Sequence, residues 1–318
     1  MHDFLSTPRK QSFEQFFRTQ NKNDFQGVYR WHQSVSSSFL AVMNDFEITL
    51  RNTIHFSLSN FYDTANNNCF DWMGLAVIQA GHSPNHIPHR LNGQRQQQQN
   101  NQGAPRYTGS LGKIQDGIQT LTNKGKPITP DAVVAEMTFA FWPNVIQQLA
   151  HPSHNQRRST ILSAMLPHAP SHDIALITIL NKLLKQIRLL RNRLGHHDSL
   201  LKFKEVDTQG NAGFIPQKPR HTITSMKLMI QHMQMILNWI DHGLSSRLQQ
   251  SDHWHRLDML LSLDVLGYYR FDYGISGCYV RAINYLSSIE KGKCYQAKKK
   301  YRRAKFPKEH QIIEAYPH

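Results

Sequence analysis

Apolar residues recur along the chain at steps of three and four, the spacing that gathers them on one face of an α-helix. The longest such run covers residues 25–62, and shorter runs cover residues 131–150, 173–197 and 222–248. Sustained alternation of apolar and polar residues, the pattern of a half-buried strand, does not occur, and there is no strong hairpin signal. The chain is therefore predicted to be all-α.

The segment 79–112 interrupts this helical pattern. It contains the stretch GHSPNHIPHRLNGQRQQQQNNQGAP, which is rich in Gln, Asn, Gly and Pro and has no apolar period. Such a composition is typical of a loop that packs little of its surface. We expect a mobile surface loop here.

The helix predicted over residues 173–197 ends in an unusual group of polar residues, LLRNRLGHHDSLL. Arg191 takes a place where the apolar stripe would continue with a leucine; the stripe consists of Ile177, Leu180, Leu184, Ile187 and Leu194. An arginine in this position is costly to bury without a partner or a cleft. It is either a core-edge arginine that reaches water or a carboxylate, or a functional group.

The residues after Arg191 add titratable chemistry at the same helix end. Asn192 and His196 are four residues apart and share a helix face. His196 lies about 140° around the helix from Arg191, at about 100° per residue. Two routes would bring the two side chains together: an end or bend of the helix at Gly195, or a second copy of the helix across a two-fold axis.

The long helix at residues 25–62 carries a second polar group. Glu47, Arg51 and His55 are spaced four residues apart, and Asn52 lies beside them. One interpretation is an ion pair between Glu47 and Arg51 on a solvated face. Alternatively, Glu47 pairs with an arginine of a functional site and holds it in place.

Composition narrows the class of protein. The 318 residues lack an apolar run of about 18 residues, so no membrane span is expected. The first residues do not resemble a signal peptide, and Cys69, Cys278 and Cys294 lack the spacing of a disulfide or metal framework. We expect a soluble, cytoplasmic protein with reduced cysteines.

The charge indicates a polyanionic partner, most often a nucleic acid. The net charge is +15 and the sequence pI is about 9.8. Residues 290–308 alone contain nine Lys/Arg and one acid, and eight of the eleven tyrosines follow residue 262.

We therefore divide the chain into a helical domain, 1–262, and a basic aromatic RNA-binding extension, 263–318. The expected contacts are Lys298, Lys299, Lys300, Tyr301, Arg302, Arg303 and Lys305. The alternative is a solvated basic tail.

Metal and cofactor motifs are weak despite 19 histidines. The candidate ligands, which no cysteine or carboxylate cluster completes, are His82, His86, His89, His253 and His255. No metal site and no cofactor are expected.

Phe139, Phe141 and Trp142 are interpreted as core residues, with a base-stacking platform as the alternative.

Three blocks of the sequence resemble the abortive-infection (Abi)-like family, which is similar to the HEPN-domain ribonucleases. The blocks are YRWHQSVSSSFLAVMNDFEITLRNTIHFSLSNFY (29–62), ITPDAVVAEMTFAFW (128–142) and LRNRLGHHDSLL (190–201), and RNRLGH matches the HEPN Arg-x4-His element. The resemblance extends over residues 25–245. It implies a helical bundle that dimerises, metal-independent RNA cleavage, and a role as a toxin in phage defence or a toxin–antitoxin system. Some members of the family are associated with a small non-coding RNA.

The residue types fit this chemistry independently, because RNA carries its own nucleophile, the 2′-hydroxyl. A histidine suits proton transfer near neutral pH, and an arginine suits stabilisation of the phosphorane. We assign proton transfer to His196, phosphate stabilisation to Arg191 and orientation to Asn192, with support from His197, Glu47, Arg51 and Asn52. Two alternatives stay open: a non-catalytic RNA-binding protein, and a HEPN partner of a nucleotidyltransferase antitoxin.

Overall fold

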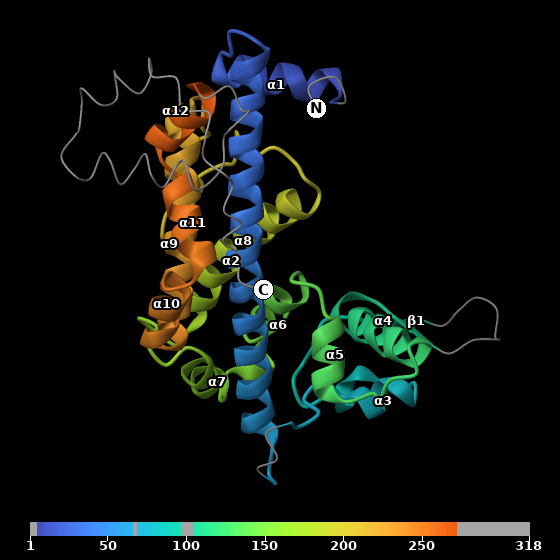
Figure 1. The fold of residues 1–318 in the computed structure, drawn as a ribbon. Helices are drawn as coiled ribbons and strands as arrows, with labels where there is room; N and C mark the ends of the chain where they lie inside the picture. The colour runs from blue at the N-terminus through green and yellow to red at the C-terminus, as the bar shows by residue number, and fades with distance from the viewer. Residues whose placement is uncertain (1–4, 66–68, 97–104, 272–318) are drawn as a thin grey trace. The chain divides into compact units, whose positions relative to one another are not determined.

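α-Helices dominate the structure, a computed structural model that describes residues 5–65, 69–96 and 105–271 (Figure 1). The predicted all-α class is confirmed. The helices are α1 (Thr7–Phe17), α2 (Lys22–Tyr62), α3 (Leu75–Gln79), α4 (Gly109–Asn123), α5 (Pro130–Glu136), α6 (Phe141–Gln148), α7 (Arg158–Met165), α8 (Ile174–Gly195), α9 (Pro219–Ile240), α10 (His242–Gln249), α11 (Asp252–Leu260) and α12 (Leu263–Phe271). Two 3₁₀ turns, η2 (Pro84–His86) and η3 (Pro152–His154), and two short strands, β1 (Arg95–Gln96) and β2 (Arg106–Tyr107), complete the described elements.

The chain divides into two compact units. The first consists of residues 1–33 and 262–318, and the second of residues 34–261. Helix α2 begins in the first unit and continues in the second. The residues predicted to bind RNA in the tail, 298–305, lie outside the described residues.

The first unit has an aromatic core and one strong ion pair. Phe13 is fully buried, and its ring makes edge contacts with Phe25 and with Tyr29. Arg270 of α12 donates two hydrogen bonds of 2.6 Å to the carboxylate of Asp24 on α2. A paired, bidentate contact of this kind is the strongest form of side-chain ion pair. It ties the segment after residue 262 to the beginning of the chain.

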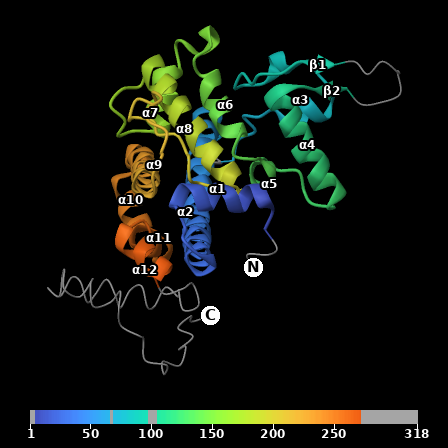
Figure 2. The same cartoon turned by 90° about the horizontal axis from the view of Figure 1, so that it is seen from above.

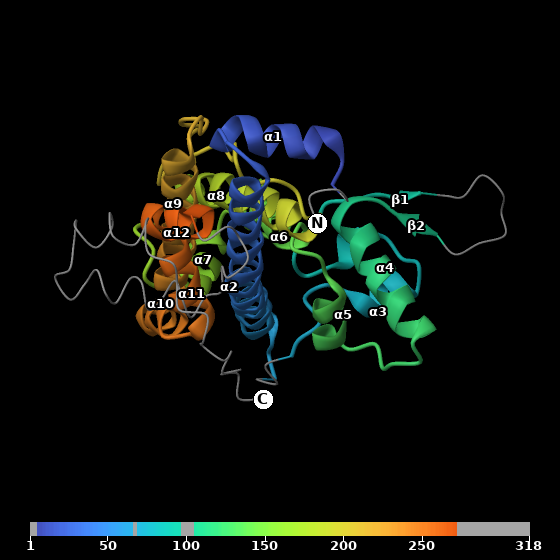
Figure 3. The same ribbon diagram turned by 45° about the horizontal axis from the view of Figure 1, so that its top comes forward.

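The second unit contains a stack of long helices and a smaller group of short elements. Within it α8 packs against α6 and α9, and α9 packs against α10 (Figure 3). The smaller group consists of α4 with α3, α5 and β2 around it, and β2 pairs with β1 in antiparallel order (Figure 2). The core of this unit includes three fully buried aromatic side chains, Phe46, Trp72 and Trp142.

Helices α2 and α8 confirm the predicted runs 25–62 and 173–197, but the other two predictions of single helices are wrong. The run 131–150 is broken between α5 and α6 at residues 137–140. A continuous helix would place Phe141 on the face opposite Phe139, whereas the break lets Phe139, Phe141 and Trp142 all be buried. These three aromatic residues are therefore core residues, as interpreted. The run 222–248 is broken at Asp241, which leaves α9 in an extended conformation and accepts a hydrogen bond from the Gly243 amide as the N-cap of α10.

The described part of the segment 79–112 packs more of its side chains than its composition indicated. Buried side chains, among them Ile87, His89, Leu91 and Tyr107, anchor the segment, and the Tyr107 hydroxyl donates to the carbonyl of His82 at 2.8 Å. The strands β1 and β2 form here, where no hairpin was expected. The scattered apolar residues are enough to anchor the backbone although they follow no period. Residues 97–104, which include most of the glutamine run, lie outside the described residues.

No helix in the described ranges is both long and apolar enough to cross a membrane.

Two adjacent buried histidines make the second unit sensitive to acid. The rings of His89 and His154 lie 4.9 Å apart between centroids. Burial lowers the pKa of His89 to about 3 and that of His154 to about 4, and Arg157 opposes protonation of both. Neither Nδ1 has a hydrogen-bond partner among the described atoms. The folded protein therefore holds these rings in their neutral form.

We expect the free energy of unfolding to fall as the pH drops below about 6.5, because the unfolded chain then binds protons that the folded chain excludes. Each histidine should contribute about 1–1.5 kcal/mol of this loss between pH 7.5 and 5.5. Urea unfolding at the two pH values measures the difference. A His154→Gln variant, which lacks one of the two groups, should show a smaller difference. Equal unfolding free energies of the wild-type protein at both pH values would contradict the account.

Candidate active site

Helix α8 carries the residues predicted to perform the chemistry, and its sequence sets both of its ends. Asp173 is the N-cap and accepts hydrogen bonds from the amides of Ala175 and Leu176. The bond from the Leu176 amide, the largest cause, holds the pKa of the Asp173 carboxyl below its usual value. Apolar residues on one face, including Leu180, Leu183, Leu184, Ile187, Leu190 and Leu194, are buried. This burial fixes the rotation of α8 and so decides which side chains face outward.

Arg191 lies at the edge of this buried face. The sequence had indicated a position within the face, in place of a leucine. Leu190 and Leu194 continue the seam after Ile187, because the step 187–190–194 keeps the three-four spacing. The Arg191 side chain is 42% exposed, and its Nε lies 3.6 Å from Oε2 of Glu47 on α2, whose side chain is 13% exposed. Arg191 thus has a carboxylate partner, which fits both a core-edge arginine and a functional arginine held by Glu47. The same contact makes Glu47 the residue that holds it.

Glu47 does not form the ion pair with Arg51 that would make this part of α2 a solvated ion-pair face. The structure records no ion pair between these two described residues, although they lie one turn apart. Arg51 is half-buried, and its Nε has no hydrogen-bond partner among the described atoms. Asn52, beside it, is half-buried. Glu47 therefore contacts Arg191 of α8 and not Arg51, which lies one turn away on its own helix.

The last turn of α8 presents Asn192, His196 and His197 to solvent. His196 is the C-cap, and its amide donates to the Asn192 carbonyl at 2.9 Å. The His197 amide donates to the Leu194 carbonyl at 3.2 Å, and the Asp198 amide donates to the Arg193 carbonyl at 2.7 Å. This pair of bonds is the Schellman arrangement, which requires a left-handed residue after the cap. His197 takes that conformation, with φ of 54°.

Arg193 belongs to the fold and not to the exposed group. Its Nη1 donates to the Ser199 carbonyl at 3.1 Å, and its guanidinium lies 5.3 Å from the centroid of the Phe203 ring. It thereby holds the chain that leaves the helix. Two arginines two residues apart thus have different roles, with Arg191 open on one side and Arg193 engaged by the exit segment.

The structure does not join Arg191 to His196 by a hydrogen bond within one copy of the described chain. The helix ends at Gly195, yet His196 keeps φ of −93° and ψ of 6°, so its direction changes little from that of a continuing helix. The wide angular separation of the two side chains expected from the sequence therefore persists. The end of the helix does not by itself bring the two side chains together.

Comparison with known proteins supports the resemblance seen in the sequence. The profile of the Abi-like protein family matches residues 1–202, which is more than half of the chain. The chain belongs to the Abi-like family. The match begins earlier than the resemblance inferred from the sequence, at residue 1 and not 25, and it ends at 202 and not at 245. No curated protein and no solved structure gives a match.

The matched part of this Abi-like chain includes both halves of the site, Glu47 on α2 and the end of α8. It stops seven residues after Gly195, where α8 ends. Helices α9 to α12 follow the matched region. Membership in the family points to an abortive-infection protein.

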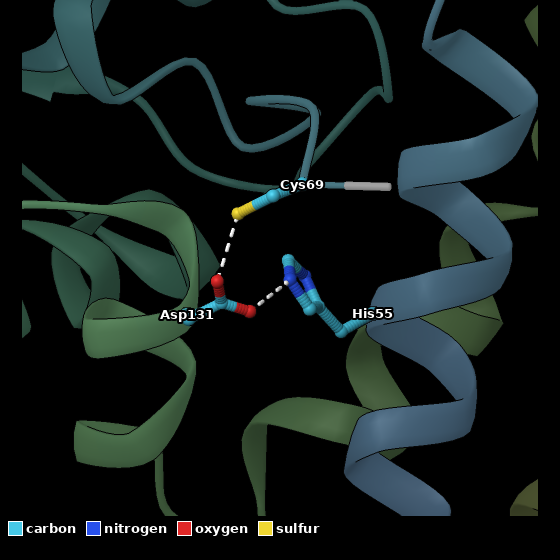
Figure 4. Close-up of side chains that lie close together, drawn as sticks. All are labelled: His55, Cys69 and Asp131. Carbon is cyan, nitrogen blue, oxygen red and sulfur yellow. Dashed lines mark hydrogen bonds and ion pairs between the residues drawn. The ribbon is translucent and has the colours of Figure 1, made fainter. Parts of the chain in front are cut away.

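A second polar cluster in the Abi-like chain was missed by the sequence analysis. The indole N–H of Trp72 donates to Nδ1 of His55 at 3.0 Å. Nε2 of His55 lies 3.0 Å from Oδ1 of Asp131 (Figure 4). The Cys69 thiol donates to the other carboxylate oxygen of Asp131 at 2.9 Å (Figure 4). The residues are far apart in the sequence, so no spacing could have revealed them.

Three of these residues, His55, Cys69 and Asp131, offer ligand atoms that all lie within 4.8 Å of one another, as a metal site would require. The positions of the protons on His55 and Cys69 favour a hydrogen-bonded network over a metal site. Because Trp72 donates to Nδ1, the proton of the neutral imidazole is on Nε2, the atom a metal would need. Burial lowers the pKa of His55 against the influence of Asp131, and burial, together with Asp131, raises the pKa of the Cys69 thiol. Both donors thus keep their protons and share one carboxylate.

The histidines that the sequence analysis considered as ligands do not converge. His82 and His86 are exposed, whereas His89 is completely buried and its Nε2 faces the Val145 carbonyl at 3.4 Å. His253 and His255 are exposed on α11.

Proposed function

We propose that this Abi-like protein is a metal-independent endoribonuclease of the HEPN type, acting as a toxin in abortive infection or in a toxin–antitoxin system. The observation that carries the proposal is the end of α8. There Arg191, Asn192, His196 and His197 are grouped in one exposed turn, and the half-exposed arginine is held by a largely buried glutamate from another helix.

This arrangement supports the chemistry of RNA transesterification. The largely buried carboxylate of Glu47, 3.6 Å from Nε, attracts the guanidinium and leaves its other N–H groups for an anion. Such a cation stabilises the extra negative charge of a pentavalent phosphorane. His196 takes the proton from the 2′-hydroxyl as the 2′-oxygen attacks phosphorus, and the imidazolium so formed returns a proton to the 5′-oxygen as the P–O5′ bond breaks. The products are a 2′,3′-cyclic phosphate and a 5′-hydroxyl, and the reaction uses no metal-bound water.

A dimer with the two α8 ends facing each other across a two-fold axis completes the site in this proposal. Arg191 and His196 of one copy point in directions that differ by about 140°. In the paired arrangement Arg191 of one copy and His196 of the other reach the same phosphate, and neither helix bends. Exposed apolar side chains on the two contributing helices, Ile48 on α2 and Leu189 on α8, provide area for the contact.

RNA is the proposed substrate, and the segment 263–318 is proposed to bind it. The net charge of +15 and the basic residues 290–308 supply an electrostatic attraction for phosphates. The family resemblance adds a small non-coding RNA or an antitoxin as a proposed partner of the chain.

Expression in a bacterial host is the experiment that tests the proposed activity. Wild-type protein is expected to stop growth and fragment total RNA, whereas equal amounts of Arg191→Ala protein should do neither, because the phosphate loses its fixed cation. Lys185→Ala, which removes an exposed cation from the same helix six residues earlier, is the matched control and should remain toxic. Equal growth arrest by wild type and Arg191→Ala would contradict the proposal, as would growth arrest with intact RNA.

A further inference from the structure

At the end of α8, Gly195 and His197 each occupy a backbone position that favours the other residue type, and this lowers the stability of the turn. We refer to residues 192–198 as the terminal turn. Gly195 occupies the last helical position, where glycine is less favourable than alanine. His197 occupies the left-handed position after the cap, where glycine is the favourable residue. Moving the glycine two positions along the chain would remove both costs.

Nothing in the packing around Gly195 requires a glycine. A Cβ atom built on Gly195 would meet a single side-chain atom within 4 Å, Nη1 of Arg191 at 3.9 Å, which is an ordinary van der Waals distance. The backbone there is helical and does not need positive φ. What the missing Cβ provides is open space beside the Arg191 guanidinium.

The space borders Nη1 of the Arg191 guanidinium. Its Nε is directed to Glu47 at 3.6 Å, and its Nη1 is the atom nearest to the gap at Gly195. An anion that approaches over the bare backbone of residue 195 reaches Nη1 without displacing Glu47. A methyl group at 195 would cover part of this approach.

His197 is one of two described non-glycine residues with positive φ; the other is Arg18, at the end of α1. A left-handed conformation is unfavourable for residues with a Cβ and is enriched at functional sites. Because the following Asp198 amide closes the Schellman bond to Arg193, the conformation is fixed by the fold. It turns the His197 side chain away from the direction it would have in a continuing helix.

We propose that the terminal turn is a phosphate-binding turn, in which Gly195 opens the approach to Arg191 and His197 is a second histidine that contacts the substrate. The inference rests on the proposed function and deepens it, since it assigns His197 a direct contact with RNA. The residues at 195 and 197 lower the stability of the turn, and in return an RNA phosphate can reach Arg191 and His197. Stability and RNA binding should therefore change in opposite directions when either position is optimised for the helix.

Two variants test this opposition, Gly195→Ala and His197→Gly. Each should raise the melting temperature by about 2 °C, since each removes a backbone cost. Each should weaken binding of a single-stranded 2′-O-methyl RNA, which cannot be cleaved, by about tenfold or more, and should lower cleavage of unmodified RNA at least as much. His197→Asn, which tolerates the left-handed conformation, should keep the wild-type melting temperature and still lose binding.

Matched controls separate the backbone effect from the site. Arg18→Gly makes the same change of residue type at the other left-handed position, and Gly213→Ala adds a methyl group where the nearest atom, Cβ of Glu205, is 3.6 Å away. Arg18→Gly should be stabilised, and both controls should bind and cleave RNA like the wild type. The mass of each variant in solution is measured as well.

The outcomes distinguish this inference from the proposed activity. Wild-type affinity and cleavage in Gly195→Ala or in His197→Asn overturn the inference while leaving the nuclease intact. If Gly195→Ala turns a dimer into a monomer, the glycine serves contact between copies and the phosphate assignment is wrong. If the wild type binds the 2′-O-methyl RNA but cleaves nothing, and the variants lose binding, the inference stands and the proposed activity fails.

Discussion

Replacing His196 by alanine is expected to lower the rate of RNA cleavage roughly 10²–10⁴-fold, the usual loss for a proton-transfer group. The side chain is exposed at the end of α8, and the cap is made by its backbone amide, which alanine retains. The unfolding free energy should therefore stay close to that of the wild type. Purified protein, an RNA substrate and a parallel denaturation curve are sufficient for the measurement.

His253→Ala is the matched control, because His253 is also exposed on a helix of the second unit but lies outside the proposed site. Its cleavage rate should equal that of the wild type. A folded His196→Ala protein that cleaves RNA at the wild-type rate would remove this residue from the mechanism. A loss of activity together with a loss of folding would assign His196 a structural role.

Two inactive variants are expected to restore activity when they are paired in one dimer. A heterodimer of an Arg191→Ala chain and a His196→Ala chain has one site that lacks both groups and one that contains both. If each site takes Arg191 from one copy and His196 from the other, this heterodimer should have about half the activity of the wild-type dimer. Coexpression with two different affinity tags and sequential purification yields the mixed species.

The alternative geometry gives a different result. If Arg191 and His196 of the same chain form the site, both sites of the heterodimer are defective and the mixture stays as inactive as its parents. A chain that is monomeric at micromolar concentration and fully active would likewise exclude the shared site. The experiment thus tests the explanation for the angular separation of the two side chains.

The long helices could be predicted because their signals are local. Residues 25–62 and 173–197 combine a sustained apolar period with, for α8, an aspartate N-cap, and the structure places α2 and α8 within a few residues of these bounds. The breaks at residues 137–140 and at Asp241 could not be predicted in this way. The first break allows Phe139, Phe141 and Trp142 to be buried together, which depends on the tertiary fold. The second occurs because Asp241 caps the next helix, although the apolar period continues past it.

The candidate site was predictable in part. The sequence identified Arg191 and Glu47, but whether Glu47 pairs with Arg51 or with Arg191 depends on how α2 meets α8 in the fold. The network of Trp72, His55, Asp131 and Cys69 was beyond reach, because Asp131 is 76 residues from His55 in the sequence. The left-handed His197 was also missed, since a glycine two residues earlier is the usual signal for the end of a helix.

The chemical identity of the cleavage products is the most direct test of the central claim, metal-independent RNA cleavage at the end of α8. Wild-type protein in excess EDTA should cut RNA to leave a 2′,3′-cyclic phosphate and a 5′-hydroxyl. Neither the His196→Ala protein nor an RNA with a 2′-deoxynucleotide at the cleaved position should give these products. A strict requirement for a divalent metal ion, or fragments that end in a 3′-hydroxyl, would contradict the account.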